Sequence, residues 1–155
     1  MTDKLNYSEG DCFAVPLRNG GFARGIVSRM NGRGIVFGYF FGPKILQLAD
    51  VRIASDLTPE RAVLTCQFGD LGLLNQQWPV VGKIPRWSCE QWPMPTFLYA
   101  DPNGNTGFIR EYDKDSLKCV REQKVLLSQI SKGEFPKDGL KGYGAVEITL
   151  TKLLG

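Results

Sequence analysis

The residues best suited to chemistry in this 155-residue chain are its carboxylates, because the sequence contains no histidine. Histidine is the commonest general base and zinc ligand, so its absence removes every Ser-His-Asp or Cys-His arrangement. Two facing carboxylates could still hydrolyse a glycosidic bond, and Asp101, Glu111 and Asp113 are the candidates. Asp101 opens an Asp-Pro-Asn-Gly turn and Asp113 begins an Asp-Lys-Asp-Ser turn, so turn formation explains both. We therefore expect a protein that is not an enzyme.

The cysteines and the glycine-rich turns offer no clearer chemistry. The spacing of the four cysteines fits no compact disulfide framework and no zinc ribbon; they are Cys12, Cys66, Cys89 and Cys119. We expect reduced thiols that pack as small hydrophobic side chains, with a disulfide or a metal role as the alternative. The Arg-Asn-Gly-Gly and Asn-Gly-Arg-Gly turns match neither a dinucleotide-binding pattern nor a P-loop. The sequence therefore predicts no cofactor and no metal site.

Aromatic and arginine side chains are the remaining candidates, since both are enriched where proteins bind other proteins. Residues 85–95 contain three prolines and two tryptophans in eleven residues, which favours a rigid extended loop. Trp78 and the run 39–41 are more typical of a buried core. The residues that we predict to bind a partner are Arg33, Arg86, Trp87 and Trp92.

Composition limits the class of protein further. The hydrophobic content of 43% and charged content of 23% are those of a folded chain, and the length suits a single domain over residues 1–155. The net charge of +3 is spread along the chain, whereas nucleic-acid binders concentrate their basic residues, so nucleic-acid binding is not expected. The N-terminus has no apolar signal region and no stretch is long enough to span a membrane. We expect a cytoplasmic protein with no membrane contact.

The elements that must position these residues are mostly strands. Alternating apolar residues predict strands over 11–17 and 22–30. The run 35–41 is apolar on both faces, so it is expected to be buried on both, or buried on one face while its aromatic rings meet a partner on the other. Glycine turns join the three strands. Gly25 in the second strand indicates a bulge or a sharp bend. Gly42-Pro43 is expected to end the third strand.

Further strands are expected later in the chain, with little helix. The pattern predicts strands around 50–54, 62–68 and 78–84 and then a meander over 96–100, 107–112 and 117–125. Thr58-Pro59 favours one helical turn. The C-terminal segment fits both helix and strand, and we favour a closing helix over 145–154. The fold class is mainly β, a single domain with a strongly bent antiparallel sheet or a partly open barrel and short helical pieces near the C-terminus.

The opening motif GDCFAVPLRNGGFARGIV at 10–27, followed by GYFFGP at 38–43, resembles the immunity protein 26 family of bacterial polymorphic toxin systems. The later sequences WPVVG at 78–82 and WPMPTF at 92–97 look like further landmarks of that family. The resemblance implies a predominantly β protein that neutralises a cognate toxin by binding it. It brings no binding residues with it, because its motif residues are of the kinds that build strands and turns.

The sequence and the resemblance together predict a cytoplasmic immunity protein that binds a bacterial toxin domain. The alternative is a small β-barrel module that binds a small molecule or a nucleic acid, with Tyr39, Trp87 or Trp92 lining its pocket. The toxin's activity and the oligomeric state are not encoded in these patterns.

Overall fold

Nine strands form two sheets in the computed structural model, which describes residues 5–155. The larger sheet has the order β5 (Val80–Lys83), β1 (Asp11–Pro16), β2 (Phe22–Met30), β3 (Ile35–Ile45), β4 (Leu64–Gly69) and β9 (Leu140–Lys141). The smaller sheet has the order β6 (Phe97–Ala100), β7 (Thr106–Tyr112) and β8 (Cys119–Leu126). Two α-helices are present, α1 (Leu71–Leu74) and α2 (Tyr143–Leu154). The predicted mainly β class is confirmed, and the sheets do not close into a barrel.

Strands β1, β2 and β3 form an antiparallel meander at the centre of the larger sheet, as the sequence predicts. The turns between them use glycine at left-handed φ, with Gly20 at 96° and Gly32 at 71°. Such angles are strained for other residues, so the glycines fix where the chain reverses. Residues 11–45 therefore set the frame of the sheet.

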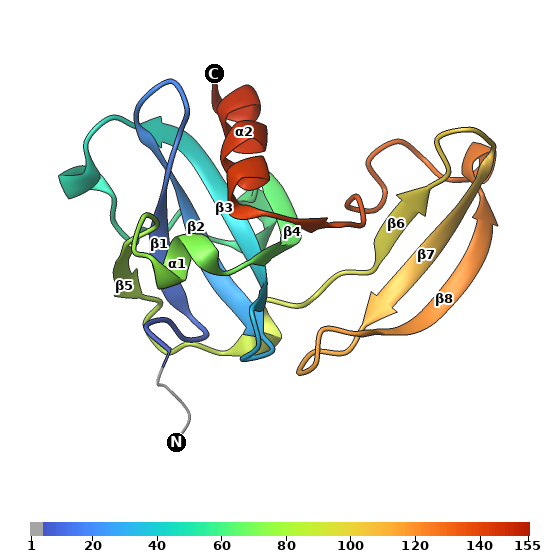
Figure 1. The fold of residues 1–155 in the computed structure, drawn as a ribbon, viewed down its shortest axis with the longest axis horizontal. Helices are drawn as coiled ribbons and strands as arrows, with labels where there is room; N and C mark the ends of the chain where they lie inside the picture. Colours follow the sequence, from blue (N-terminus) through green and yellow to red (C-terminus); the bar gives the residue numbers. More distant parts are fainter. Residues whose placement is uncertain (1–4) are drawn as a thin grey trace.

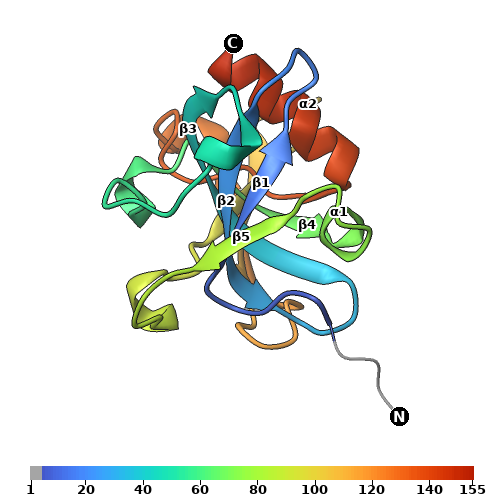
Figure 2. The ribbon, with the colours of Figure 1, turned by 90° about the vertical axis from the view of Figure 1, so that its left-hand side faces the viewer.

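Both faces of this sheet are buried, because the side chains of β3 alternate between two apolar clusters. Val36 and Phe40 join one cluster, which α2, α1 and Trp78 cover. Phe37 and Tyr39 join the other, which is covered by the loop around Trp92. Figures 1 and 2 show α2 lying across the sheet. The predicted burial of residues 39–41 and of Trp78 is confirmed, with Trp78 only 1% exposed.

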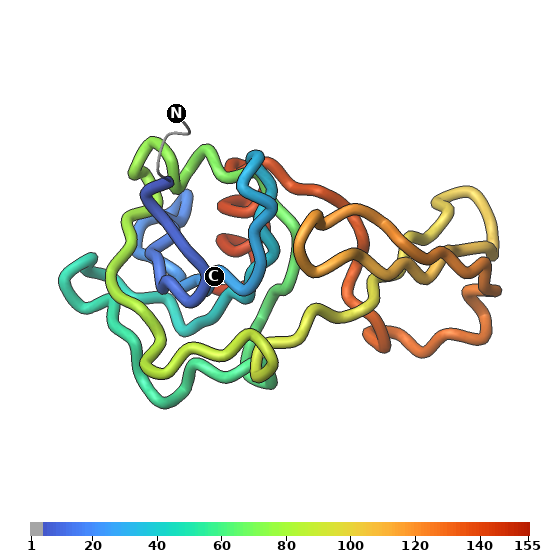
Figure 3. The backbone as a smooth tube through the Cα atoms, turned by 90° about the horizontal axis from the view of Figure 1, so that it is seen from below, coloured from blue at the N-terminus to red at the C-terminus, as the bar shows by residue number. Residues whose placement is uncertain are grey.

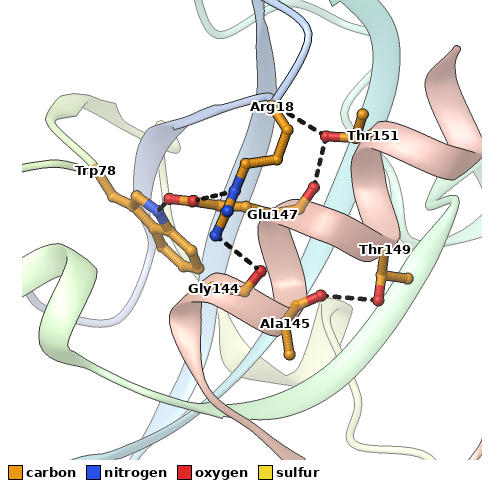
Figure 4. A network of polar contacts seen from close by, with 7 residues as sticks. All are labelled: Arg18, Trp78, Gly144, Ala145, Glu147, Thr149 and Thr151. Atoms are coloured by element: carbon orange, nitrogen blue, oxygen red, sulfur yellow. Dashed lines mark hydrogen bonds and ion pairs between the residues drawn. The ribbon is translucent and has the colours of Figure 1, made fainter.

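A polar network fixes α2 on the sheet (Figure 4). The buried carboxylate of Glu147 accepts hydrogen bonds from the Trp78 indole at 2.9 Å and from Arg18 Nε at 3.1 Å. The backbone N–H of Arg18 donates to the Thr151 hydroxyl at 2.9 Å. A carboxylate this buried is costly unless its oxygens are satisfied, so the network sets the position of the helix along the sheet. The closing helix that the sequence favours over 145–154 is thereby confirmed.

The smaller sheet projects from the side of the larger one (Figures 1 and 3). Its near end is anchored by Phe97 and Leu117, which are buried in the second cluster. Residues 136–138 run beside β6, where the Leu98 N–H donates to the Pro136 carbonyl at 2.9 Å, and then continue into β9 of the larger sheet. One returning segment therefore joins the two sheets.

Two expectations about individual strands were wrong. Strand β3 does not end at Gly42-Pro43 but continues to Ile45, paired with β2 alone. Its pairing with β4 stops at Phe40, so the missing backbone N–H of Pro43 breaks no hydrogen bond to β4. No strand forms at 50–54; a 3-10 turn (Leu48–Asp50) precedes this segment, and Arg24 of β2 holds it by reaching Arg52 and Asp56.

Three further 3-10 turns lie at Pro59–Arg61, Cys89–Gln91 and Leu127–Gln129. The first is the helical turn predicted after Thr58, whereas α1 was not predicted at all. Among residues 5–155, no helix is long and apolar enough to cross a membrane.

Gly25 does not itself form a bulge, because the pairing irregularities of β2 lie on either side of it. The packing of a neighbouring side chain explains why this residue is glycine. A Cβ atom at Gly25 would lie 2.4 Å from the ring of Phe13 on the neighbouring strand. The bare Cα lets this ring lie flat over β2 and stack on Trp78 at 5.6 Å between centroids.

We predict that Gly25→Ala lowers the free energy of unfolding by about 2–3 kcal/mol, because the Phe13 ring is backed by other aromatic rings and must be displaced. Chemical denaturation measures the loss. Gly69→Ala is the matched control, since its φ is not left-handed and a Cβ there meets one backbone atom, at 4.0 Å, and it should leave stability nearly unchanged. Equal losses in both variants would contradict this explanation of Gly25.

Candidate functional site

The carboxylates considered for catalysis are engaged in local structure. Asp101 accepts the N–H of Asn103 at 2.9 Å, and Asp113 accepts that of Ser116 at 2.7 Å. Glu111 lies 3.6 Å from Arg121 on the neighbouring strand. Asp101 and Asp113 stand at opposite ends of β7, whose seven residues separate them by roughly 20 Å. These acids therefore do not face one another across a cleft.

The loop of residues 85–95, the tryptophan-proline loop, is a cover for the larger sheet. The Ser28 hydroxyl donates to the Trp92 carbonyl at 2.7 Å, and the Tyr39 hydroxyl donates to the carbonyl of Pro93. Arg29 donates to the Cys89 carbonyl at 3.1 Å. Burial raises the pKa of Tyr39 to about 12, so its hydroxyl remains a donor at neutral pH. Three side chains from β2 and β3 thus hold the loop in place.

The structure separates the four predicted partner-binding residues. Trp92 is only 4% exposed and packs against Tyr39 and Phe41, so it has little surface to offer. Trp87 is half-buried and stacks on Trp92 at 6.0 Å. Arg86 is exposed, with the chain held at φ 55°. The loop therefore presents Arg86 and part of Trp87 to the surface.

Arg33 lies elsewhere, in the exposed turn between β2 and β3. It lines a depression of about 340 Å³ together with Asn31 and with Asp115, Ser116 and Lys118 from the turn between β7 and β8. Both turns line this depression, and its lining includes no residue of the tryptophan-proline loop. The four predicted residues therefore do not form one patch.

A hollow that was not predicted lies at the edge of β4. This cleft, of about 610 Å³, runs between Leu64–Cys66 of β4 and the returning segment 133–141. Strand β9 pairs only with Gln67 and Phe68. Within the described chain, the outer edge of β4 over residues 64–66 is therefore left without a neighbouring strand.

The cleft is basic as well as open. The charged side chains in its lining are Lys137 and Lys141, and no acid accompanies them there among the described residues. At its base, burial raises the pKa of the Cys66 thiol to about 12, although Lys141 nearby acts in the opposite direction. The thiol is therefore neutral at physiological pH. The cleft combines free backbone hydrogen-bonding groups with two cations.

Sequence patterns could not have located this cleft. The alternation over 62–68 predicts a strand, but nothing in it tells which edge stays unpaired. Lys137 and Lys141 come from a segment with no strong pattern, some seventy residues after β4. Only the short parallel pairing of β9 brings them to this edge.

Comparison with known proteins yields one match. A family model described as immunity protein 26 matches residues 8–107, which span β1 to β6 and the start of β7. No curated protein and no solved structure matches the chain.

We predict that Trp92→Ala lowers the free energy of unfolding by about 3–5 kcal/mol, because it removes the ring that fills the space over Tyr39 and Phe41. Arg86→Ala in the same loop should change it by no more than about 0.5 kcal/mol, because that side chain is exposed. Chemical denaturation of the two variants distinguishes a cover from a free binding loop. A Trp92→Ala variant as stable as the parent would show that the loop is not a structural element.

Proposed function

The chain belongs to the immunity protein 26 family, and from this premise we propose that it binds a cognate bacterial toxin domain and neutralises it. The observation that carries the proposal is the family match over residues 8–107, which includes most of the larger sheet and the tryptophan-proline loop. The protein would act by occupying the toxin's surface, without catalysis or cofactor. We place this action in the cytoplasm of the producing cell, where a toxin domain would meet its target.

We propose the cleft beside β4 as the surface that receives the toxin. An extended segment could add to the free edge of Leu64–Cys66 through backbone hydrogen bonds, which is a common mode of protein recognition. Lys137 and Lys141 would favour a segment that carries Asp or Glu, because complementary charge speeds association and fixes the register. Val63, 41% exposed at the same edge, adds apolar area.

Three of the four residues predicted from the sequence to bind a partner remain part of the proposed toxin interface. Arg33 and Arg86 are exposed and Trp87 is half-buried, so these three side chains can extend a toxin interface beyond the cleft. Trp92 would contribute indirectly, by holding Trp87 in place. Arg residues and Trp residues with open surface are the usual energetic centres of such interfaces.

The alternative of a small-molecule or nucleic-acid module has weaker support. It relied on Tyr39, Trp87 or Trp92 stacking on a ligand ring, but Tyr39 and Trp92 are each only 4% exposed. Their faces are covered by other aromatic side chains of the core. The cations that line the cleft are two lysines, which are few for a nucleic-acid surface.

We predict that the protein rescues cells that express the toxin domain encoded next to it, and that Lys137→Glu/Lys141→Glu weakens binding about tenfold or more. Binding is measured by titration calorimetry with an inactivated toxin domain, and rescue by cell survival. The matched control is Lys114→Glu/Lys152→Glu, which changes the charge equally at exposed positions outside the cleft. Killing that continues in the presence of the protein would refute the proposed function. Rescue with no difference between the two variants would refute only the proposed surface.

We also propose that residues 1–155 act as a single domain. Phe97 and Leu117 of the smaller sheet complete the second apolar cluster of the larger one, and β9 and α2 return to the larger sheet after it. Neither part should then be stable alone, so calorimetry is expected to record one unfolding transition. Two separate transitions would contradict the single domain.

A further inference from the structure

The outer edge of β8 is the longest uncovered strand edge of the smaller sheet. All residues of this eight-residue strand except Val125 are exposed. The opposite edge of the same sheet, at β6, is covered by residues 136–138. Within residues 5–155, nothing pairs with β8 on its outer side. Proteins normally cover, shorten or interrupt such edges, because free N–H and C=O groups promote pairing with another chain.

The direction of the backbone groups along β8 follows from its pairing with β7. The Leu127 N–H donates to the Asn105 carbonyl at 2.8 Å, on the β7 side. Since these groups alternate in direction along an antiparallel strand, Val125, Gln123 and Arg121 also face β7. The groups of Glu122, Lys124 and Leu126 therefore point outward and are free to pair.

We propose that β8 is a homodimerisation strand, which pairs antiparallel with β8 of a second copy about a twofold axis at Gln123. This inference does not depend on the proposed toxin binding. In this register Glu122 lies opposite Lys124 of the second copy, and the same pair occurs twice by symmetry. Leu126, which is 48% exposed, lies near each end of this pairing, and Val120 falls at the pairing irregularity where β8 meets Glu111 and Tyr112.

Charge selects this register among those that the backbone permits. A shift by one residue would set outward-facing groups against inward-facing ones, so only shifts by two preserve the hydrogen bonds. A shift by two in one direction places Glu122 opposite Glu122, and in the other it places Lys124 opposite Lys124. Like charges directly opposite one another are destabilising. One register therefore combines full backbone pairing with opposite charges.

The position of β8 also leaves room for a second copy. The strand runs outward from the body of the molecule along the projecting sheet (Figure 1). Antiparallel pairing places the second body beyond the far end of the sheet, so the two bodies do not meet. Glu122 Oε2 accepts from Arg110 of its own chain at 3.1 Å, and its other oxygen can face Lys124 of the second copy. The contact is small, so we expect a weak dimer.

The first test is sedimentation velocity of the purified protein from about 5 µM to about 500 µM at low salt, where a weak dimer becomes populated. Lys124→Glu and Glu122→Lys should each weaken the dimer about tenfold, because each creates two like-charge contacts. An equimolar mixture of these two variants, and the doubly reversed variant, should recover the dimer. Lys132→Glu, at an exposed position outside β8, is the control and should dimerise like the parent.

A protein that stays monomeric over this range overturns the proposal, as does a dimer that Lys124→Glu leaves intact. Failure of the mixed variants to recover the dimer overturns the register. Because no toxin is present, these outcomes are independent of the proposed function.

A disulfide at the twofold axis is the second test. Gln123→Cys in a Cys89→Ser/Cys119→Ser background should form a cross-linked dimer on mild oxidation, since directly opposite residues in such a pair lie within disulfide reach. Arg121→Cys in the same background would face Val125 and should cross-link far less. Equal cross-linking of both variants would indicate random collision and would overturn the proposed axis.

Discussion

The burial of the larger sheet on both faces is the constraint on which the rest of the molecule depends. Strand β3 is apolar on both sides, so it cannot remain folded until two separate covers are in place. One cover is α2, at the end of the chain, and the other is the tryptophan-proline loop in its middle. Both covers are held by polar groups as well as by apolar packing: Glu147 binds Trp78 and Arg18, and Ser28, Arg29 and Tyr39 bind the loop. Neither face of the sheet is then free to meet a partner.

The proposed recognition surfaces therefore lie at the edges of the sheets. The returning segment 133–141 closes the edge of β6 and then only part of the edge of β4. What it leaves open is the basic cleft on one side and β8 on the other. A free strand edge offers regularly spaced donors and acceptors, and nearby charges decide which segment can use them. The two edges differ in this respect, because the cleft presents lysines alone whereas β8 carries both signs of charge.

The sequence predicted the features that depend on neighbouring residues. Alternation and turn glycines located β1, β2 and β3, and the helical spacing of Val146 and Leu150 favoured α2. It could not predict that the later meander would separate into a second sheet, because that depends on which strands meet at a distance. Trp92 illustrates the same limit in the binding prediction. A tryptophan among prolines suits both an interface and a loop anchor, and only Tyr39 and Phe41, some fifty residues earlier, decide that it is buried.

The part of the chain after the family match has two distinct physical roles. The match ends at residue 107, yet Val146 and Leu150 of α2 are fully buried in the first cluster. Without them, Phe40 and Trp78 would be exposed to water, so this region belongs to the fold. The same region supplies Lys137, Lys141 and all of β8, which the core does not require. Since their side chains stabilise little of the scaffold, they can specify what the two open edges bind while the family scaffold stays the same.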